Sequence, residues 1–268
     1  MADSAASATA APAASAGSAG SGPAPARRGQ ARTAVLWQAV SAVLDAPTPR
    51  DVLDVGGGTG GFAVPIAELG HRVTVVDPSP DALAALERRA AEAGVPKDAL
   101  RAVQGDLAGL LEHVEPGSVD LVLCHGVLEM ADDPAVGLAV VADVLRPGGV
   151  VSVLAANRTA AVVARALGGH FAEARRALAD PRGRFGAQDP LAARFDEEQL
   201  SRLLADAGLT VQSVHGVRVF TDLVPGALVD TEPHGAADLA ALEAAVADRP
   251  EFRAVAGRLH LLARKIAS

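Results

Sequence analysis

Residues 52–60 have the sequence VLDVGGGTG, and this stretch decides the fold. Its first four residues are a short, largely apolar run of the kind that forms a buried strand, and glycines at positions 56, 58 and 60 follow directly. Glycine lets the backbone turn tightly and lets a ligand approach the main chain closely. The third glycine comes one position earlier than in the G-x-G-x-x-G fingerprint of dinucleotide-binding sheets. The stretch therefore predicts a strand, a nucleoside-binding loop and a helix, with a plain tight turn as the alternative.

Strands and helices alternate around this loop. Helices are expected where apolar residues recur at helical spacing, and strands where short apolar runs lie between turn residues. The alternation predicts a doubly wound α/β fold with a parallel sheet. The expected strands lie at 51–55, 72–76, 100–104, 119–124 and 150–155, and the expected helices at 33–44, 60–69, 80–93, 107–113 and 134–145.

The alternation stops after Ala155 and resumes at Asp196. Asp196, with Gln199 three positions later, forms a capping-box pattern that begins a helix ending at Gly208. Two more strands are expected at 211–220 and 259–263, with an acidic helix at 236–248. The interruption at 155–195 holds seven arginines against three acidic residues in a chain of net charge −8. We expect this insertion to be a basic cap facing an anionic substrate, with a solvated loop as the alternative.

The composition is that of a globular protein with a sizeable core. Hydrophobic residues make up 50% of the 268 residues and charged residues 21%. The single cysteine, Cys124, excludes an internal disulfide and a cysteine-based zinc site, and no metal is expected. Residues 1–29, rich in Ala, Ser, Gly and Pro, are predicted to be a disordered tail, which leaves a folded domain at 30–268. The single cysteine also leads us to expect a reducing, cytoplasmic location, and no apolar run is long enough to span a membrane.

Two carboxylates follow the second and third expected strands. Asp77 lies 19 residues after Gly58, about the distance at which an acidic residue binds ribose hydroxyls in nucleotide-binding folds. Pro78 would then line the adenosine edge. Asp106 could accept a hydrogen bond from an adenine amino group while Leu107 packs on the ring. Capping of the helix that follows is the alternative for each carboxylate.

Two further segments complete a recognisable set. Residues 124–129, CHGVLE, follow the fourth expected strand, and residues 144–149, VLRPGG, lead into the fifth. Ligands of doubly wound sheets bind at the carboxyl ends of the strands. Together and in this order, the five segments resemble the class I S-adenosylmethionine-dependent methyltransferases from about residue 30 to 265. The resemblance implies a Rossmann-like, mostly parallel seven-stranded sheet with an insertion after the fifth strand, and S-adenosylmethionine as cofactor.

The resemblance also implies roles for single residues. His125 would lie beside the sulfonium and the incoming nucleophile. The glycine loop would contact the methionine part of the cofactor, the carboxylate after the second strand the ribose, and the carboxylate after the third strand the adenine. The residues concerned are Gly56, Gly57, Gly58, Asp77 and Asp106.

Three other segments, 32–38, 216–222 and 257–265, resemble one branch of that family. Its bacterial members convert the carboxylate of 5-carboxymethoxyuridine at the tRNA wobble position to its ester. This resemblance implies that Arg32 holds the cofactor carboxylate with a bidentate guanidinium, a solvated helix start being the alternative. We expect Asn157, Arg158 and Arg218 to bind substrate, although Arg218 could instead pair with an acid at the sheet edge.

The expected role of His125 depends on the methyl acceptor. A carboxylate has a reference pKa of about 4, so it is ionised at neutral pH and needs no general base. His125 would then be a positioning group first. A hydroxyl or amine would need a base, for which His125 and Glu129 are the candidates. The leading acceptor is tRNA. The alternatives are a small anionic metabolite and, in a different class, a nicotinamide-dependent oxidoreductase or nucleotide-binding module.

Overall fold

The computed structural model describes residues 24–45, 47–231 and 234–266, with the side chains of residues 24–32 and 230 left out. Seven strands form one sheet with the order β3-β2-β1-β4-β5-β7-β6. The strands from β1 to β5 pair in parallel, whereas β7 runs antiparallel to both β5 and β6. The predicted seven-stranded, mostly parallel sheet is therefore confirmed. The strands are β1 Asp51–Val55, β2 Arg72–Asp77, β3 Leu100–Gln104, β4 Val119–His125, β5 Leu145–Ala156, β6 Leu209–Val217 and β7 Arg258–Lys265.

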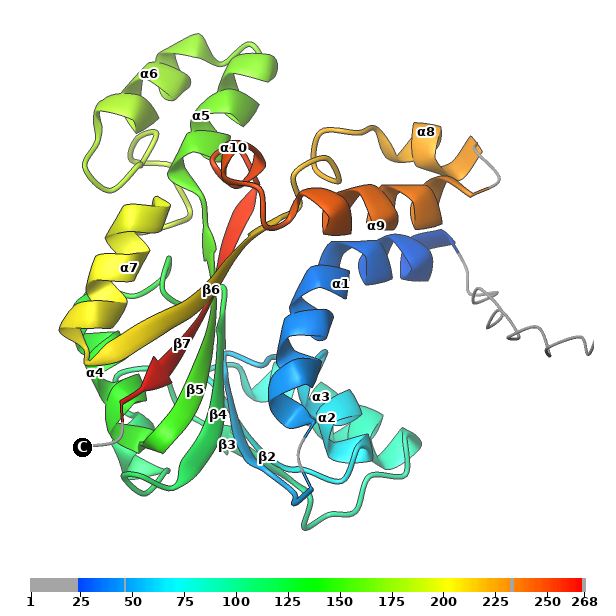
Figure 1. Ribbon diagram of the computed structural model, residues 1–268, viewed down its shortest axis with the longest axis vertical. Helices are drawn as coiled ribbons and strands as arrows, with labels where there is room; N and C mark the ends of the chain where they lie inside the picture. Colours follow the sequence, from blue (N-terminus) through cyan, green and yellow to red (C-terminus); the bar gives the residue numbers. More distant parts are fainter. Residues whose placement is uncertain (1–23, 46, 232–233, 267–268) are drawn as a thin grey trace, which may run out of the picture.

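Helices cover both faces of the sheet (Figure 1). Helices α1, α2 and α3 lie on one face and α4 and α7 on the other, while α5 and α6 lie beyond the carboxyl end of β5. No described helix has the length and apolarity that a membrane span requires. The helices are α1 Ala24–Leu44, α2 Ala63–Glu68, α3 Pro80–Glu92, α4 Pro134–Val144, α5 Arg158–Leu167, α6 Phe171–Ala179, α7 Glu197–Asp206, α8 Gly226–Thr231, α9 Gly235–Val246 and α10 Pro250–Arg253, with a 3₁₀ turn η1 at Leu110–Glu112.

The core has two layers, because successive side chains of a strand point to opposite faces. In β1, Val52 belongs to the layer under α1, α2 and α3, whereas Leu53 belongs to the layer under α4 and α7. In β4, Leu121 and Val122 divide between the layers in the same way. Each central strand is thus buried on both faces, which explains its nearly continuous apolar sequence.

Several boundaries differ from those expected. Helix α1 begins at Ala24, so residues 24–29 are helical, whereas residues 1–23 of the predicted tail lie outside the described residues. The helix expected at 107–113 is only the η1 turn. The insertion begins after Ala156, where β5 ends, and it contains α5 and α6 rather than a plain loop.

The strand expected at 211–220 ends at Val217 because the backbone turns there. Arg218 adopts a left-handed conformation, with φ of 62°. The next three backbone N–H groups, from Val219 to Thr221, donate hydrogen bonds to the buried carboxylate of Glu243 instead of to a neighbouring strand. The Glu243 side chain of α9 therefore takes the place of the strand–strand hydrogen bonds that would continue β6.

Alanine substitutions at two glycines near α2, Gly60 and Gly70, would show how tightly the loop after β1 is packed. Both have positive φ, +79° at Gly60 and +91° at Gly70, but a Cβ atom at Gly60 would lie 2.3 Å from Cδ1 of Leu86, whereas one at Gly70 meets nothing within 4 Å. We expect Gly60→Ala to lower the free energy of unfolding by about 2–5 kcal/mol, from left-handed strain and overpacking together. Gly70→Ala carries only the strain, about 1–2 kcal/mol. Urea unfolding measures both losses, and equal losses would contradict this packing.

Candidate functional site

The loop at residues 56–61 joins β1 to α2 and lies against two neighbouring segments. A Cβ atom at Gly56 would lie 2.7 Å from Cγ2 of Val127, and one at Gly57 would lie 2.5 Å from a carboxylate oxygen of Asp54. At Gly58, with φ of +54°, the nearest atom would be 3.9 Å away. The first two glycines therefore serve the packing of the turn itself, while Gly58 leaves space in which a ligand can approach the backbone.

Asp77, at the end of β2, holds this loop in place. One carboxylate oxygen accepts a hydrogen bond from the N–H of Gly58 and the other from the N–H of Ser79, both at 2.9 Å. A carboxylate has about four acceptor positions, so each oxygen keeps capacity for a ligand hydroxyl. The cap of α3 is the hydroxyl of Ser79, which accepts from the N–H of Ala82. Asp77 is therefore not the helix cap that the alternative interpretation required.

Asp54 lies beneath the same loop, at the end of β1. Burial, together with the nearby charge of Asp77, raises the pKa of Asp54 to about 7. Two neighbouring carboxyl groups in a poorly hydrated place resist being ionised together. Asp54 can therefore carry a proton near neutral pH while Asp77 serves as the acceptor for loop and ligand.

A cavity of about 390 Å³ opens beside the loop, between the ends of β1, β2 and β4. Four residues expected to bind cofactor contribute to its lining: Gly56, Pro78, Asp106 and Leu107. The apolar part of the lining comes from Val55, Val76, Val127, Met130 and Val136. Its size and its mixture of apolar walls with a few polar groups suit a nucleoside.

Asp106 has the capping role considered for it, and one of its carboxylate oxygens stays free. Its Oδ1 accepts hydrogen bonds from the N–H groups of Ala108 and Gly109, at 3.1 and 3.0 Å, which is the capping role. No described residue donates to its Oδ2, which remains an acceptor for an amino group. Leu107 is buried against Gly137, where a Cβ atom would lie 2.4 Å from Cδ2 of Leu107.

His125 is the last residue of β4. Its Nε2 lies 2.8 Å from Oγ of Ser152, and its ring meets Phe62 edge-on with centroids 5.1 Å apart. Trp37 of α1 stacks on Phe62 in turn, at 4.6 Å. Burial, with the positive charge of Arg258 nearby, lowers the pKa of His125 to about 3, so the imidazole is neutral at neutral pH. Its Nδ1 is buried and has no hydrogen-bond partner among the described residues.

Glu129 and Arg258 form an ion pair beside His125. Nothing in the sequence predicted this pair. The Glu129 side chain is 2% exposed, and its Oε1 accepts a hydrogen bond from Arg258 at the start of β7. The Glu129 carbonyl accepts from the N–H groups of Ala192 and Ala193, which fastens the end of the insertion over the site. Arg258 lies in a segment that carried the family resemblance, but its partner is 129 residues away and no local spacing joins the two.

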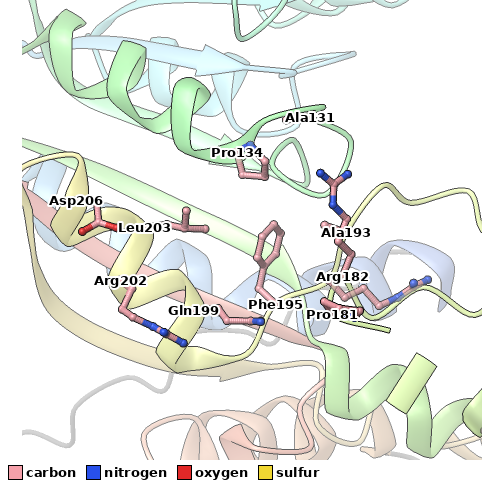
Figure 2. A pocket seen from close by; sticks show the side chains of 11 residues that line it. Ala131, Pro134, Pro181, Arg182, Ala193, Phe195, Gln199, Arg202, Leu203 and Asp206 are labelled. Atoms are coloured by element: carbon pink, nitrogen blue, oxygen red, sulfur yellow. The ribbon is translucent and has the colours of Figure 1, made fainter. Parts of the chain in front are cut away.

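A second cavity, of about 420 Å³, lies between α4, α7 and the insertion (Figure 2). Ala131 lines both cavities, so the second one adjoins the first. Figure 2 shows Phe195 between Pro134 and the side chains of α7, with Arg182 and Arg202 at the border of the space. An acceptor that enters here meets an apolar floor, the side chains of Arg182, Arg194 and Arg202, and the carboxylate of Asp206.

The residues expected to bind substrate are engaged in the fold. The amide nitrogen of Asn157 donates to the carbonyls of residues 253, 254 and 256, and its oxygen accepts from the N–H of Thr159, so this buried side chain joins α5 to the segment before β7. Arg158 donates to the carbonyl of Leu178. Arg218 pairs with Asp222, as the alternative interpretation proposed. Asn157 is therefore a structural residue, not a free substrate ligand.

Much of the positive charge of the insertion is also used internally. Arg194 forms a buried two-bond pair with Asp189, at 2.6 and 3.0 Å. Arg165 pairs with Glu173 at 3.2 Å and lies over the ring of Phe185. Arg182, exposed at the second cavity, is not used in this way. The side chain of Arg32 lies outside the described part of the chain, and the described residues contain no cluster of metal-ligating side chains.

The buried histidines give stability a defined pH dependence. The pKa of His125, like that of His260 and His215, is lowered by burial, so the unfolded chain takes up protons below about pH 6.5 that the folded chain does not. Stability is therefore lost as the pH falls from 6.5 towards the folded pKa of about 3. For His125 the loss between pH 6.5 and 5 is at most about 2 kcal/mol.

We expect His125→Gln to reduce the slope of unfolding free energy against pH in this range. The raised pKa of Asp54 acts in the opposite sense, but it is common to both proteins and cancels in the comparison. His170→Gln, at an exposed position, is the matched control. Denaturant unfolding at several pH values measures the slopes, and an unchanged slope in His125→Gln would refute the assignment of a neutral imidazole.

Comparison with known proteins agrees with this geometry. Residues 53–151 match a family model described as a methyltransferase domain. The chain is 34% identical over 197 residues to the tRNA 5-carboxymethoxyuridine methyltransferase of Escherichia coli strain K12, covering 73% of this chain and 74% of that protein. It is 32% identical over 193 residues to the ubiquinone biosynthesis O-methyltransferase of Xanthomonas axonopodis pv. citri, covering 72% and 76%.

The fold is also that of a solved structure. A SAM-dependent methyltransferase from Methanosarcina mazei aligns with a TM-score of 0.58 at 18% identity, over 83% of this chain and 95% of that one. The glycine loop, the carboxylates after β2 and β3 and the sheet order are thus found together with a family match. The chain belongs to the class I S-adenosylmethionine-dependent methyltransferases, and S-adenosylmethionine is its cofactor.

Proposed function

We propose that this enzyme methylates the carboxylate of 5-carboxymethoxyuridine at the wobble position of tRNA. The observation that carries the proposal is the 34% identity to the Escherichia coli enzyme of that name, extending over 197 residues and so beyond the 53–151 methyltransferase core. The arginines at the second cavity support it, because they suit an acceptor with a phosphate backbone. A tRNA acceptor also implies that the enzyme acts in the cytoplasm.

The cofactor site that we propose is the loop and the cavity beside it. The backbone at Gly56, Gly57 and Gly58 would face the methionine part, and Asp77 would accept from the ribose hydroxyls. Pro78, Asp106 and Leu107 would enclose the adenine, and Arg32 remains our candidate for the cofactor carboxylate. When bound, S-adenosylmethionine supplies an electrophilic methyl group on a positively charged sulfur. The free Oδ2 of the exposed Asp106 and the open approach to Gly58 are the features that fit it.

The protein's task with a carboxylate acceptor is alignment. An ionised carboxylate is already a nucleophile at neutral pH, so rate is gained by holding it in line with the methyl group. A neutral His125 adds no attraction between charges, and Glu129 is already paired with Arg258. The positive potential would come from Arg182 at the second cavity, since Arg202 pairs with Glu198 and Asp206 also lines the space.

A second candidate is O-methylation of a hydroxyl on a small molecule. The similarity to ubiquinone biosynthesis O-methyltransferases favours it, and so does the unpartnered Nδ1 of a neutral His125. A hydroxyl must lose its proton during methyl transfer, and Nδ1 of His125 has a free lone pair to accept it, but a pKa lowered to about 3 makes this imidazole a weak base at neutral pH. A small anionic metabolite would satisfy the same basic cavity.

The first test is methyl transfer from labelled S-adenosylmethionine to total tRNA from a strain that lacks this gene. We expect a base-labile methyl ester on a modified wobble uridine, identified by mass analysis of the nucleosides. Arg182→Glu should weaken binding of every tRNA to a similar extent, and it should lower the slope of log affinity against log salt concentration by about one. Arg88→Glu, an equal charge change on exposed α3, is the control. If the protein binds the cofactor but forms no methylated tRNA, the tRNA proposal is wrong and a small-molecule acceptor is favoured.

A second test concerns the cofactor site alone. We expect Asp77→Ala to weaken S-adenosylmethionine binding by about 10- to 100-fold, because charge-assisted hydrogen bonds contribute about 1.5–3 kcal/mol. Titration calorimetry measures the affinity, and a thermal melt checks that the protein remains folded without the bond to Gly58. Asp81→Ala, which removes an exposed carboxylate from the first turn of α3, should leave affinity unchanged. Equal affinities in the two variants would refute the ribose role.

A further inference from the structure

A chain of polar side chains crosses four neighbouring strands from His125. Oγ of Ser152 on β5 lies 2.8 Å from Nε2 of His125 and 2.8 Å from Nε2 of His260 on β7. Nδ1 of His260 lies 3.0 Å from Nδ1 of His215 on β6. These two rings are nearly parallel, at 17°, and their centroids are 5.2 Å apart, which accommodates a hydrogen bond between ring nitrogens. Nε2 of His215 lies 3.5 Å from Oδ1 of Asp248.

The far end of this chain reaches solvent. Asp248 is 81% exposed and His215 is 16% exposed, whereas His260 is fully buried. His215 and Asp248 line a cavity of about 320 Å³, whose other walls come from α1, α9 and β7. The chain therefore runs from the end of β4 to a separate opening of the molecule.

The protons of the chain can be ordered in only two ways when all three rings are neutral. The Ser152 hydroxyl has one proton, so it donates to one ring and accepts from the other. The two facing Nδ1 atoms of His260 and His215 likewise share one proton. Every link therefore points either towards Asp248 or towards His125.

Asp248 distinguishes the two directions. An ionised carboxylate 3.5 Å from Nε2 of His215 attracts an N–H group and repels a lone pair, so it favours a proton on this nitrogen. Nδ1 of His215 is then an acceptor, His260 donates to it, Ser152 donates to His260, and Nε2 of His125 donates to Ser152. The reverse order would direct a lone pair of His215 at the carboxylate and bury the N–H of His125 without an acceptor among the described residues.

We propose that Asp248, His215, His260 and Ser152 are positioning residues that hold His125 in one tautomer, with its proton on Nε2 and a lone pair on Nδ1. Nδ1 of His125 is thereby presented as a buried acceptor for an O–H or N–H group of a ligand. This inference goes beyond the proposed function, because it holds whichever acceptor is methylated.

The charges around the chain favour neutral rings. Arg258 lies close to His125 and is paired with Glu129, and Arg253 lies close to His215 and is paired with Glu197. Burial lowers the pKa of all three histidines, and among the described residues only Asp248, beside His215, acts in the other direction. A protonated ring inside the chain would also leave two N–H donors facing each other.

The ordered chain can carry one proton without a charge remaining inside. If an acceptor O–H bond breaks and its proton joins Nδ1 of His125, the proton on Nε2 can pass to Ser152. Ser152 then gives its own proton to His260, His260 gives one to His215, and His215 gives one to Asp248. His125, Ser152, His260 and His215 each gain one proton and lose one, so the net result is one proton delivered to the solvent-exposed carboxylate of Asp248.

The test is ¹⁵N NMR of the full chain labelled at histidine, with His125 assigned by the loss of its signals in His125→Gln. We expect a pyrrole-like Nε2 and a pyridine-like Nδ1 at His125. Asp248→Asn should shift the ratio of tautomers about two- to fivefold towards the other form, since the amide can donate to His215. Asp238→Asn, an exposed acid on α9, is the matched control.

Ser152→Ala tests whether the effect of Asp248 reaches His125 through the hydrogen-bonded side chains, because it removes the hydroxyl that links His125 to His260. In that background Asp248→Asn should no longer affect His125. The proposal is overturned if His125 carries its proton on Nδ1, if Asp248→Asn changes nothing, if Asp238→Asn has the same effect, or if the effect of Asp248→Asn persists with Ser152→Ala. None of these measurements depends on finding the methyl acceptor.

Discussion

The reversal of strand order between β3 and β4 is the constraint on which the site depends. The chain first lays β2 and β3 on one side of β1 and then returns to place β4 and β5 on the other. The connections after β1 and β4 must leave the sheet on opposite faces, so the carboxyl ends of these strands diverge and leave room for a ligand. The glycine loop follows β1 and His125 ends β4, while Asp77 lies at the end of the neighbouring strand β2, so each owes its place to this topology.

Buried polar groups, more than apolar packing, hold the segments that complete the site. Glu243 satisfies three successive backbone N–H groups where β6 would otherwise continue. Asn157 binds three carbonyls before β7, and Glu129 joins Arg258 to the end of the insertion. A buried polar group left without its partner is costly, so each of these contacts permits few alternative positions. These polar contacts thereby fix the segments of the second half of the chain around the ligand site, where empty space prevents close apolar packing.

Electrostatics divides the site into two parts. The half built from β1 and β2 collects carboxyl groups, and burial, together with the nearby charge of Asp77, raises the pKa of Asp54. The half built from β4, β5 and β7 collects neutral imidazoles and the paired charges of Glu129 and Arg258. Acceptors for hydroxyl groups thus lie on one side, and a neutral, poorly hydrated surface lies on the other. Such a surface suits transfer of a methyl group, because water would compete for it.

The sequence alone determined the parts that depend on short spacing. The strand at 51–55 with its glycine loop, Asp77 19 residues after Gly58, and the Asp196–Gln199 capping box are local patterns with local causes, and each lies where it was expected. Tertiary structure decided the remaining contacts of the site, because they join residues that are distant in the chain. Ser152 meets His260 across 108 residues, and Glu129 meets Arg258 across 129. No spacing could show that Asn157 is engaged by the fold, since the carbonyls to which it donates lie 96 to 99 residues later and reach it only when β5 and β7 pair.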